Sequence, residues 1–239
     1  MKKRVLFAAL LLLLGIIGVQ FISYKKYTIE KIEIDKTNML NESIETNYIE
    51  NKSYKIEIKN LSIDHLFLED YTKITNNGNN NQHTYVKRDN NDTVLAGIII
   101  EQVPNITSSL CNNYFKDEDT KLELDKDLEK IFKKNKINTD LNLLYYLKEN
   151  YYFNNTIFTP YKKLKTNYLL NKIVETNFNE FKSLIEIKGS LTGYIITNDY
   201  YTEIHLLDKT NSYNILLTGT EALTNDYLIS LLNSIDIKK

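Results

Sequence analysis

The chain has 239 residues, a net charge of −1 and 26% charged residues, which is the composition of an ordinary globular protein. Its near-neutral charge argues against a nucleic-acid partner or an acidic lipid partner, because both select an excess of Lys and Arg. A single cysteine excludes an intrachain disulfide. The 18 tyrosines beside no tryptophan, with abundant Asn, Lys and Ile, indicate codon bias rather than function.

The N-terminus carries an uncharged apolar run at residues 5–22, directly after the basic residues 2–4. In a helix, about 18 residues reach ~27 Å, which is enough for a thin hydrocarbon core. Residues 20–24 contain no A-x-A-like cleavage site, and the cysteine that a lipoprotein needs is missing there. We therefore predict that residues 1–22 form an uncleaved, single-pass signal anchor, with a cytoplasmic N-terminus and an external C-terminal domain.

The rest of the chain is predicted to be a stalk and one domain. Residues 23–51 are polar and weakly patterned, which is typical of a linker that lifts a domain from the bilayer. Residues 52–239 contain strand and helix patterns, and no repeat or compositional boundary divides them. They are long enough for one ample core, so we predict a single extracytoplasmic domain.

Strand alternation begins at residues 54–59, where apolar and charged side chains alternate. The Asn-rich stretch around Gly78 indicates a turn. Residues 82–88 and 93–102 flank a second polar turn and are predicted to form a hairpin. Residues 95–100 are almost all apolar, so we expect this strand to be central and buried on both faces.

The period then changes, and residues 105–176 are predicted to be a helical segment. The first helix has one apolar face, the second begins at Thr139, and the third begins at Pro160 after a threonine cap. The apolar face of the first helix consists of Leu124, Leu128, Ile131 and Phe132.

Strands return at residues 181–188, 194–197, 201–208 and 213–218, and glycines at positions 189 and 193 indicate a turn. Thr224 is the expected N-cap of a final helix, whose apolar stripe consists of Leu228, Leu231, Leu232 and Ile235. The order of strands, helices, strands and helix predicts an α+β fold with an antiparallel sheet, a central helical segment, and the last helix packed on the sheet.

The meander GYIITNDYYTEIHLLDKTNSYNILLTG and the following helix, which ends in LLNSIDI, resemble the C-terminal half of a PsbP-type α/β/α sandwich. The strands YKIEIK, HTYVKR and TVLAGIII are similar to its N-terminal half, although residues 105–176 are longer than the pattern expects. The resemblance covers about half of the chain and implies binding or assembly rather than catalysis. The whole also resembles membrane-anchored proteins of unknown function from AT-rich Gram-positive bacteria.

One pair of side chains has a catalytic arrangement. Glu203 and His205 are two residues apart on one strand, so they share a face, and a carboxylate beside an imidazole can orient it as a general base. The alternative is a cross-strand polar pair on a solvated sheet face, and we favour this alternative.

The other candidate residues are better explained by structure. His65 and His83 lack the spacing of a zinc motif, and residues 117–119 lack the alternating ligands and glycine of a calcium loop. Cys111 has neither a neighbouring His nor the context of a helix N-terminus, so it is interpreted as a structural thiol. The aromatic clusters at residues 145–146 and 151–153 are either packing residues or a surface that stacks on sugar or peptide. We predict no catalytic residue, metal site or cofactor.

These observations favour a non-catalytic, membrane-tethered extracytoplasmic protein that binds or assembles with an envelope protein or polymer. One alternative is a hydrolase-like enzyme of the cell envelope that uses Glu203 and His205. The other is a membrane-bound inhibitor or immunity-type protein with a polar binding face.

Overall fold

The computed structural model describes residues 2–27, 39–49, 55–64, 68, 70–74, 82–104, 129–150, 155–177, 181–208, 211–219 and 224–237. The chain divides into two compact units. The helical unit comprises residues 1–34, 110–138 and 146–179. The sheet unit comprises residues 35–109, 139–145 and 180–239. One dividing point falls inside helix α4 (Asp140–Asn150), within the stretch 52–239 that was predicted as a single domain.

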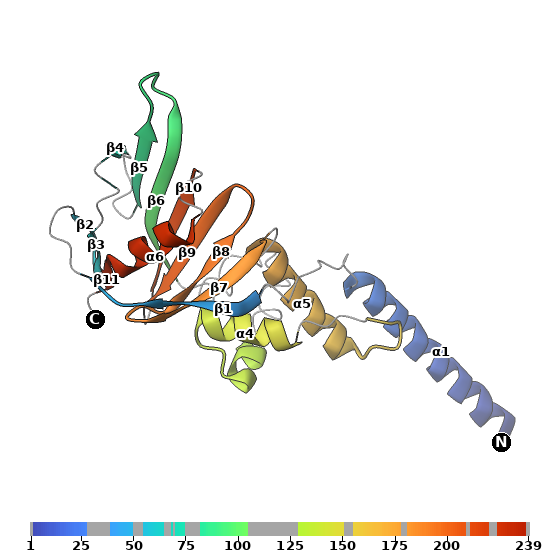
Figure 1. The fold of residues 1–239 in the computed structure, drawn as a ribbon. Helices are drawn as coiled ribbons and strands as arrows, with labels where there is room; N and C mark the ends of the chain where they lie inside the picture. Colours follow the sequence, from blue (N-terminus) through green and yellow to red (C-terminus); the bar gives the residue numbers. More distant parts are fainter. Residues whose placement is uncertain are drawn as a thin grey trace. The chain divides into compact units, whose positions relative to one another are not determined.

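The helical unit contains α1 (Lys2–Tyr27), the C-terminal part of α4, and α5 (Tyr161–Asn177) (Figure 1). The helix α4 starts at Asp140 and α5 at Tyr161, each within one residue of the predicted start. Five aliphatic side chains of α5 are buried: Leu164, Leu169, Leu170, Ile173 and Val174. In the part of the chain that the structure describes, no helix is both long and apolar enough to cross a membrane.

The sheet unit is built on an eight-stranded sheet in the order β1-β7-β8-β9-β10-β6-β5-β4. Its strands are β1 (Met39–Thr46), β4 (Thr72–Ile74), β5 (Gln82–Arg88), β6 (Val94–Pro104), β7 (Ser183–Gly189), β8 (Gly193–Thr197), β9 (Tyr201–Leu207) and β10 (Asn211–Thr218). The predicted hairpin of β5 and β6 and the predicted meander from β7 to β10 are both confirmed. The α+β class is therefore correct.

The edge strand β1 differs from the prediction in two ways. It lies in the stretch 23–51 that was predicted as a stalk, and it pairs in parallel with β7, so the sheet is mixed rather than antiparallel. Buried and exposed residues do not alternate regularly along this strand, and its register with β7 shifts between Met39 and Ser43. Gly189 has φ +103°, and a Cβ there would lie 2.2 Å from the carbonyl oxygen of Thr46, so only glycine permits this approach of the two strands.

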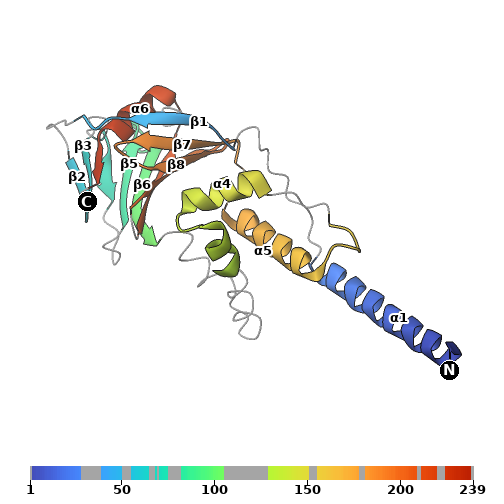
Figure 2. The same ribbon diagram turned by 90° about the horizontal axis from the view of Figure 1, so that it is seen from below.

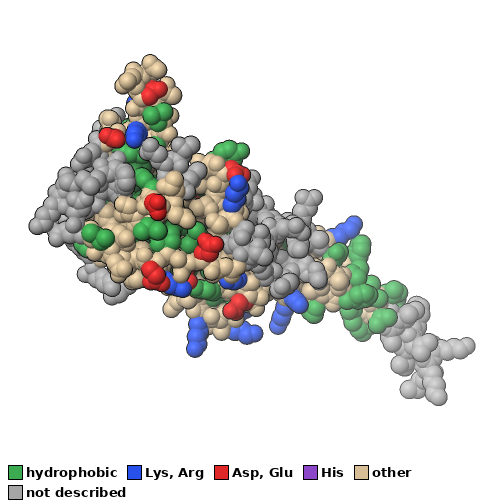
Figure 3. Space-filling view, viewed as in Figure 1, with side chains coloured by type: hydrophobic (Ala, Val, Ile, Leu, Met, Phe, Trp, Pro, Cys, Tyr) green, Lys and Arg blue, Asp and Glu red, His purple; other side chains and the backbone are tan. Residues whose placement is uncertain are grey.

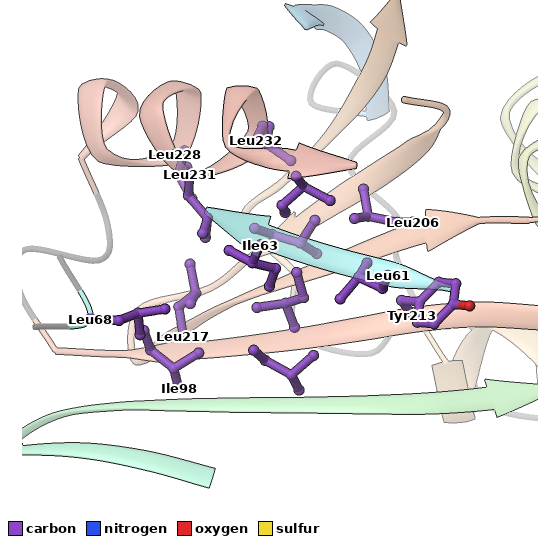
Figure 4. Close-up of a cluster of buried hydrophobic side chains, with 14 of the residues drawn as sticks. Leu61, Ile63, Leu68, Ile98, Leu206, Tyr213, Leu217, Leu228, Leu231 and Leu232 are labelled. Carbon is purple, nitrogen blue, oxygen red and sulfur yellow. The ribbon is translucent and has the colours of Figure 1, made fainter. Parts of the chain in front are cut away.

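A second sheet and the last helix pack on one face of the large sheet (Figure 2). The second sheet has the order β11-β3-β2, with β2 (Lys55–Ile58), β3 (Leu61–Asp64) and β11 (Ile235–Ile237). Figure 4 shows Leu61 and Ile63 of β3 between α6 (Asn225–Asn233) and the strands that carry Leu206 and Leu217. This aliphatic cluster is the core of the sheet unit.

The last helix confirms most of its prediction. Thr224 is the N-cap, since its hydroxyl accepts a hydrogen bond from the backbone N–H of Tyr227, and Leu228, Leu231 and Leu232 are buried. Ile235 is also buried, but it belongs to β11 and not to the helix, because the chain leaves α6 at Ser234 and pairs with β3.

The prediction that residues 95–100 are buried on both faces is wrong. Ala96, Ile98 and Ile100 are buried, whereas Leu95 is 52% exposed and Ile99 is only half-buried. The strand β6 lies in the interior of the sheet, but the core packs closely on only one of its faces. An almost wholly apolar strand sequence was therefore not evidence that both faces are buried.

Candidate functional site

The two faces of the large sheet have opposite chemistry. On the face toward the core, the register aligns an apolar row of five isoleucines on five neighbouring strands: Ile185, Ile195, Ile204, Ile215 and Ile100. One residue further along each strand, the other face carries a polar row. The polar row consists of Glu186, Tyr194, His205, Asn214, Glu101 and Gln82. We treat this row, with Glu203 beside it, as the candidate site.

Glu203 and His205 are brought together as the sequence suggests. The imidazole Nε2 of His205 lies 3.1 Å from Oε1 of Glu203, which is an ion-pair distance without the alignment of a hydrogen bond. Burial raises the pKa of Glu203, but attraction to His205 lowers it by more, so the net pKa shift is downward. His205 is almost fully buried, so the pair does not lie on a freely solvated face as we had favoured.

The surroundings of His205 are aromatic and sparsely hydrogen-bonded. The ring of Tyr194 stacks on the imidazole, with centroids 4.5 Å apart and planes inclined by 13°. Both imidazole nitrogens, the Tyr194 hydroxyl and Oδ1 of Asn214 are buried and have no hydrogen-bond partner. Buried polar atoms of this kind are normally paired, so this part of the row is an exception among buried polar groups.

The N-terminal part of α4, which belongs to the sheet unit, covers the β7 end of the polar row. The hydroxyl of Tyr145 donates a hydrogen bond to Oε2 of Glu186, and Nζ of Lys188 lies 3.1 Å from the same carboxylate oxygen. Burial raises the pKa of Tyr145 to about 12, together with the hydrogen bond to Glu186 and the negative charge of that residue. The neighbouring Tyr194 is fully buried, and burial followed by the charges of Asp140 and Glu203 raises its pKa strongly.

Exposure increases along the row from β7 to β5. Glu186, Tyr194 and His205 are buried, whereas Asn214, Glu101 and Gln82 are half-buried. On the same face, the neighbouring row continues with half-buried apolar residues, Leu216 and Ile99. We call the stretch made by Asn214, Glu101, Gln82, Leu216 and Ile99 the open end of the polar row. It offers donors, acceptors and apolar contacts on rigid strands.

The other predicted candidates do not join this site. His83 lies opposite Ile100, the last residue of the apolar row, so it lies on the other face of the sheet from His205. Burial, and then the charge of Lys73, lowers the pKa of His83. Tyr146 is half-buried, and burial raises its pKa. His65, Cys111, residues 117–119 and residues 151–153 lie outside the described residues.

The predicted meander placed the strands β7 to β10 next to one another, but the sequence did not predict the register that aligns the polar row. A two-residue turn at 198–199 would pair Tyr194 with Glu203, because partners in a hairpin lie at equal distances from its turn. The observed hairpin is centred one residue later and pairs Tyr194 with His205. The predicted turn at residues 209–211 would likewise pair His205 with Ile215, whereas the observed register pairs His205 with Asn214. A slip of one residue moves a side chain to the other face of the sheet, so the predicted turns did not assemble the row. The stacking on Tyr194 and the cover by Tyr145 depend on packing, which no local pattern reveals.

Among the residues that the structure describes, no group of three or more His, Cys, Asp or Glu side chains is arranged to hold a metal ion. Comparisons with protein-family models, with curated proteins and with solved structures found no significant match.

Proposed function

We propose that the protein is a membrane-tethered, extracytoplasmic binding or assembly protein of the cell envelope, without catalytic activity. In this proposal α1 is a single-pass anchor with its N-terminus in the cytoplasm. The sheet unit acts outside the cytoplasm and binds an envelope protein or polymer through the open end of the polar row.

The observation that carries the tether is the exposure of apolar side chains along α1. Nine large apolar residues between Leu11 and Ile22 are 44–67% exposed, and Figure 3 shows apolar side chains along α1. At about 25 cal/mol per Å² of apolar surface, such a helix is unfavourable in water and favourable in lipid. The apolar sequence continues towards the N-terminus as far as Val5, where the basic residues begin.

The binding role is supported by the open end of the polar row. Half-buried Leu216 and Ile99 lie beside the polar groups of Asn214 and Glu101, which is the mixture of apolar and hydrogen-bonding surface found in recognition sites. The strands hold these side chains in fixed register, so little ordering entropy would be lost on binding.

The tether is tested by fractionation and by a topology reporter. The full chain is expected to stay in the membrane fraction after alkaline extraction, and a reporter active only outside the cytoplasm is expected to be active when fused after Lys239. Recovery of the chain in the soluble fraction would contradict the tether, and an inactive reporter on a membrane-bound chain would contradict the orientation.

The binding face is tested by site-specific photocrosslinking in intact cells. A photoreactive amino acid at Leu216 is expected to capture an envelope component, whereas the same group at Tyr200, which is 82% exposed in a turn of the same unit, is not. Equal capture at both positions would mean that the crosslinks are non-specific, and the proposed face would be wrong.

A second candidate is a hydrolase-like enzyme that uses Glu203 as the partner of His205. The observation in its favour is the 3.1 Å contact between the two side chains and the lowered pKa of Glu203. If the protein is an enzyme, Glu203→Gln should abolish turnover of an envelope substrate without changing the amount of crosslinking at position 216. A loss of crosslinking instead would support the binding role.

A further inference from the structure

The end of α1 is attached to one specific segment of the helical unit. The side chain of Gln20 donates a hydrogen bond to the carbonyl oxygen of Thr159. Tyr27 packs edge-on against Tyr161 and Tyr168, with ring centroids 5.6 Å and 5.4 Å apart. These contacts fix the turn before α5 and its first residues beside residues 20–27 of α1.

This attachment lies at the level where the apolar run of α1 ends. Ile22 is its last apolar residue, and Lys25 and Lys26 follow, with their ammonium groups over the rings of Phe21 and Tyr27. Gln20 and Ile22 differ by only ~3 Å along the helix axis. If α1 spans a bilayer, the turn that Gln20 contacts therefore lies near the boundary between hydrocarbon and headgroups.

The surface of that turn has the composition of a membrane interface. Phe158, next to Thr159, is 88% exposed, which is an unusual position for a phenylalanine in water. Tyr161 is 41% exposed, and Lys162 and Lys163 are exposed beside it. Aromatic rings gather at the headgroup level of bilayers, and lysines there reach lipid phosphates.

We propose that Phe158, Tyr161, Lys162 and Lys163 form an interfacial collar that binds the headgroup region of the bilayer where α1 emerges. Phe158 inserts between lipid headgroups, and the two lysines pair with lipid phosphates. The collar adds a second membrane contact to the helical unit and so restricts its rotation and tilt. This inference rests on the proposed tether, because the same bilayer must hold α1.

The chain contains no tryptophan, so a single introduced tryptophan reports on its own surroundings. The full-length F158W variant is reconstituted in phosphatidylglycerol–phosphatidylcholine vesicles that carry quenchers at shallow or deep positions in the bilayer. We expect a blue-shifted emission that shallow quenchers reduce and deep quenchers do not. Because Phe158 is almost fully exposed, the substitution leaves the packing of the helical unit unchanged.

Two matched variants separate failure of the collar from failure of the tether. L13W places the reporter within the apolar run, where deep quenchers should reduce its emission, and Y200W places it on an exposed turn, where neither quencher should act. If deep quenchers reduced the emission of L13W but the emission of F158W resembled that of Y200W, the collar would be overturned and the tether would stand. Absence of quenching in all three variants would overturn both.

The lysines are tested in the F158W background. Lys162→Gln with Lys163→Gln should reduce the shallow quenching of F158W in vesicles with phosphatidylglycerol and should have a smaller effect in vesicles of phosphatidylcholine alone. An equal effect in both lipids would contradict the pairing of these lysines with anionic phosphate. Protection of F158W from quenchers only when a second protein is added would identify a protein-binding site in place of the collar.

Discussion

The helical unit and the sheet unit use aliphatic side chains in opposite ways. On α1, the described large apolar residues up to Ile22 are exposed by 44–67%, whereas the isoleucines and leucines of the sheet-unit core are almost inaccessible. The core satisfies its apolar surface by packing strands, α6 and the second sheet on one another. The helix α1 does not do this, and in our proposal lipid takes the place of that packing.

The comparison shows that similar local composition leads to different partners. An unbroken apolar run on a helix exposes side chains in all directions, so no single packing face can cover them. The strands alternate, so one face meets the core and the other carries the polar row.

The largest effect is expected from charges on α1. The double substitution Leu13→Asp with Ile16→Asp should release the full chain from the membrane fraction, because each acidic group costs about 2.5–3.5 kcal/mol near the centre of a span. Leu13→Ala with Ile16→Ala is the control and should leave the chain membrane-bound. Equal fractionation of the two variants would mean that α1 does not enter lipid.

Truncation in the sheet-unit core should have the next largest effect. Leu231 is 2% exposed, and Leu231→Ala should lower the free energy of unfolding by about 2–5 kcal/mol, measured by urea denaturation. Ile229 of the same helix is 39% exposed, and Ile229→Ala should cost less than about 1 kcal/mol. If Leu231→Ala and Ile229→Ala lowered the free energy of unfolding by similar amounts, α6 would not be part of the core.

The start of β8 should be intolerant of any side chain. A Cβ at Gly193 would lie 2.0 Å from the backbone carbonyl oxygen of His205, which cannot move aside without breaking the pairing of β8 with β9. Gly193→Ala should therefore cost about 3 kcal/mol or more. Gly97→Ala is the matched control and should cost less, because its nearest atom is the rotatable hydroxyl of Thr218. Equal urea midpoints for the two variants would contradict this register.

The cover of the polar row should depend on Tyr145. Tyr145→Phe removes the donor to the buried carboxylate of Glu186 and should cost about 1.5–3 kcal/mol in urea denaturation. Tyr146→Phe, on the neighbouring residue, should have a clearly smaller effect. If the two variants were equally stable, the bond from Tyr145 to Glu186 would not contribute to the stability of the sheet unit.

The smallest effect is expected at Glu203. Because its pKa is lowered in the fold, its carboxylate contributes stability above the ordinary value of 4.5, and this contribution is lost as the pH falls through the folded-state pKa. Glu203→Gln should therefore destabilise the chain by about 1 kcal/mol or less at pH 7, and the difference should shrink below pH 4.5. A difference that grew towards low pH would mean that the pKa is raised instead.

The sequence by itself determined the local elements of the sheet unit. Alternation and turn residues were sufficient for the β5–β6 hairpin and the meander from β7 to β10, and Thr224 was sufficient for the start of α6. These features depend on contacts between residues close in the chain, so local patterns carry them. The same locality explains why Glu203 and His205 could be recognised as neighbours.

Only the tertiary structure decided the remaining features. The strand β1 pairs with β7, which follows it by more than a hundred residues, so no local period predicts that pairing. Ile235 left the helical stripe because β3, distant in sequence, offered it a strand partner. The polar row likewise forms only when six strands pair in the correct register and the N-terminal part of α4 covers its β7 end. Long-range pairing depends on which surfaces meet, and that information is absent from any single stretch of the chain.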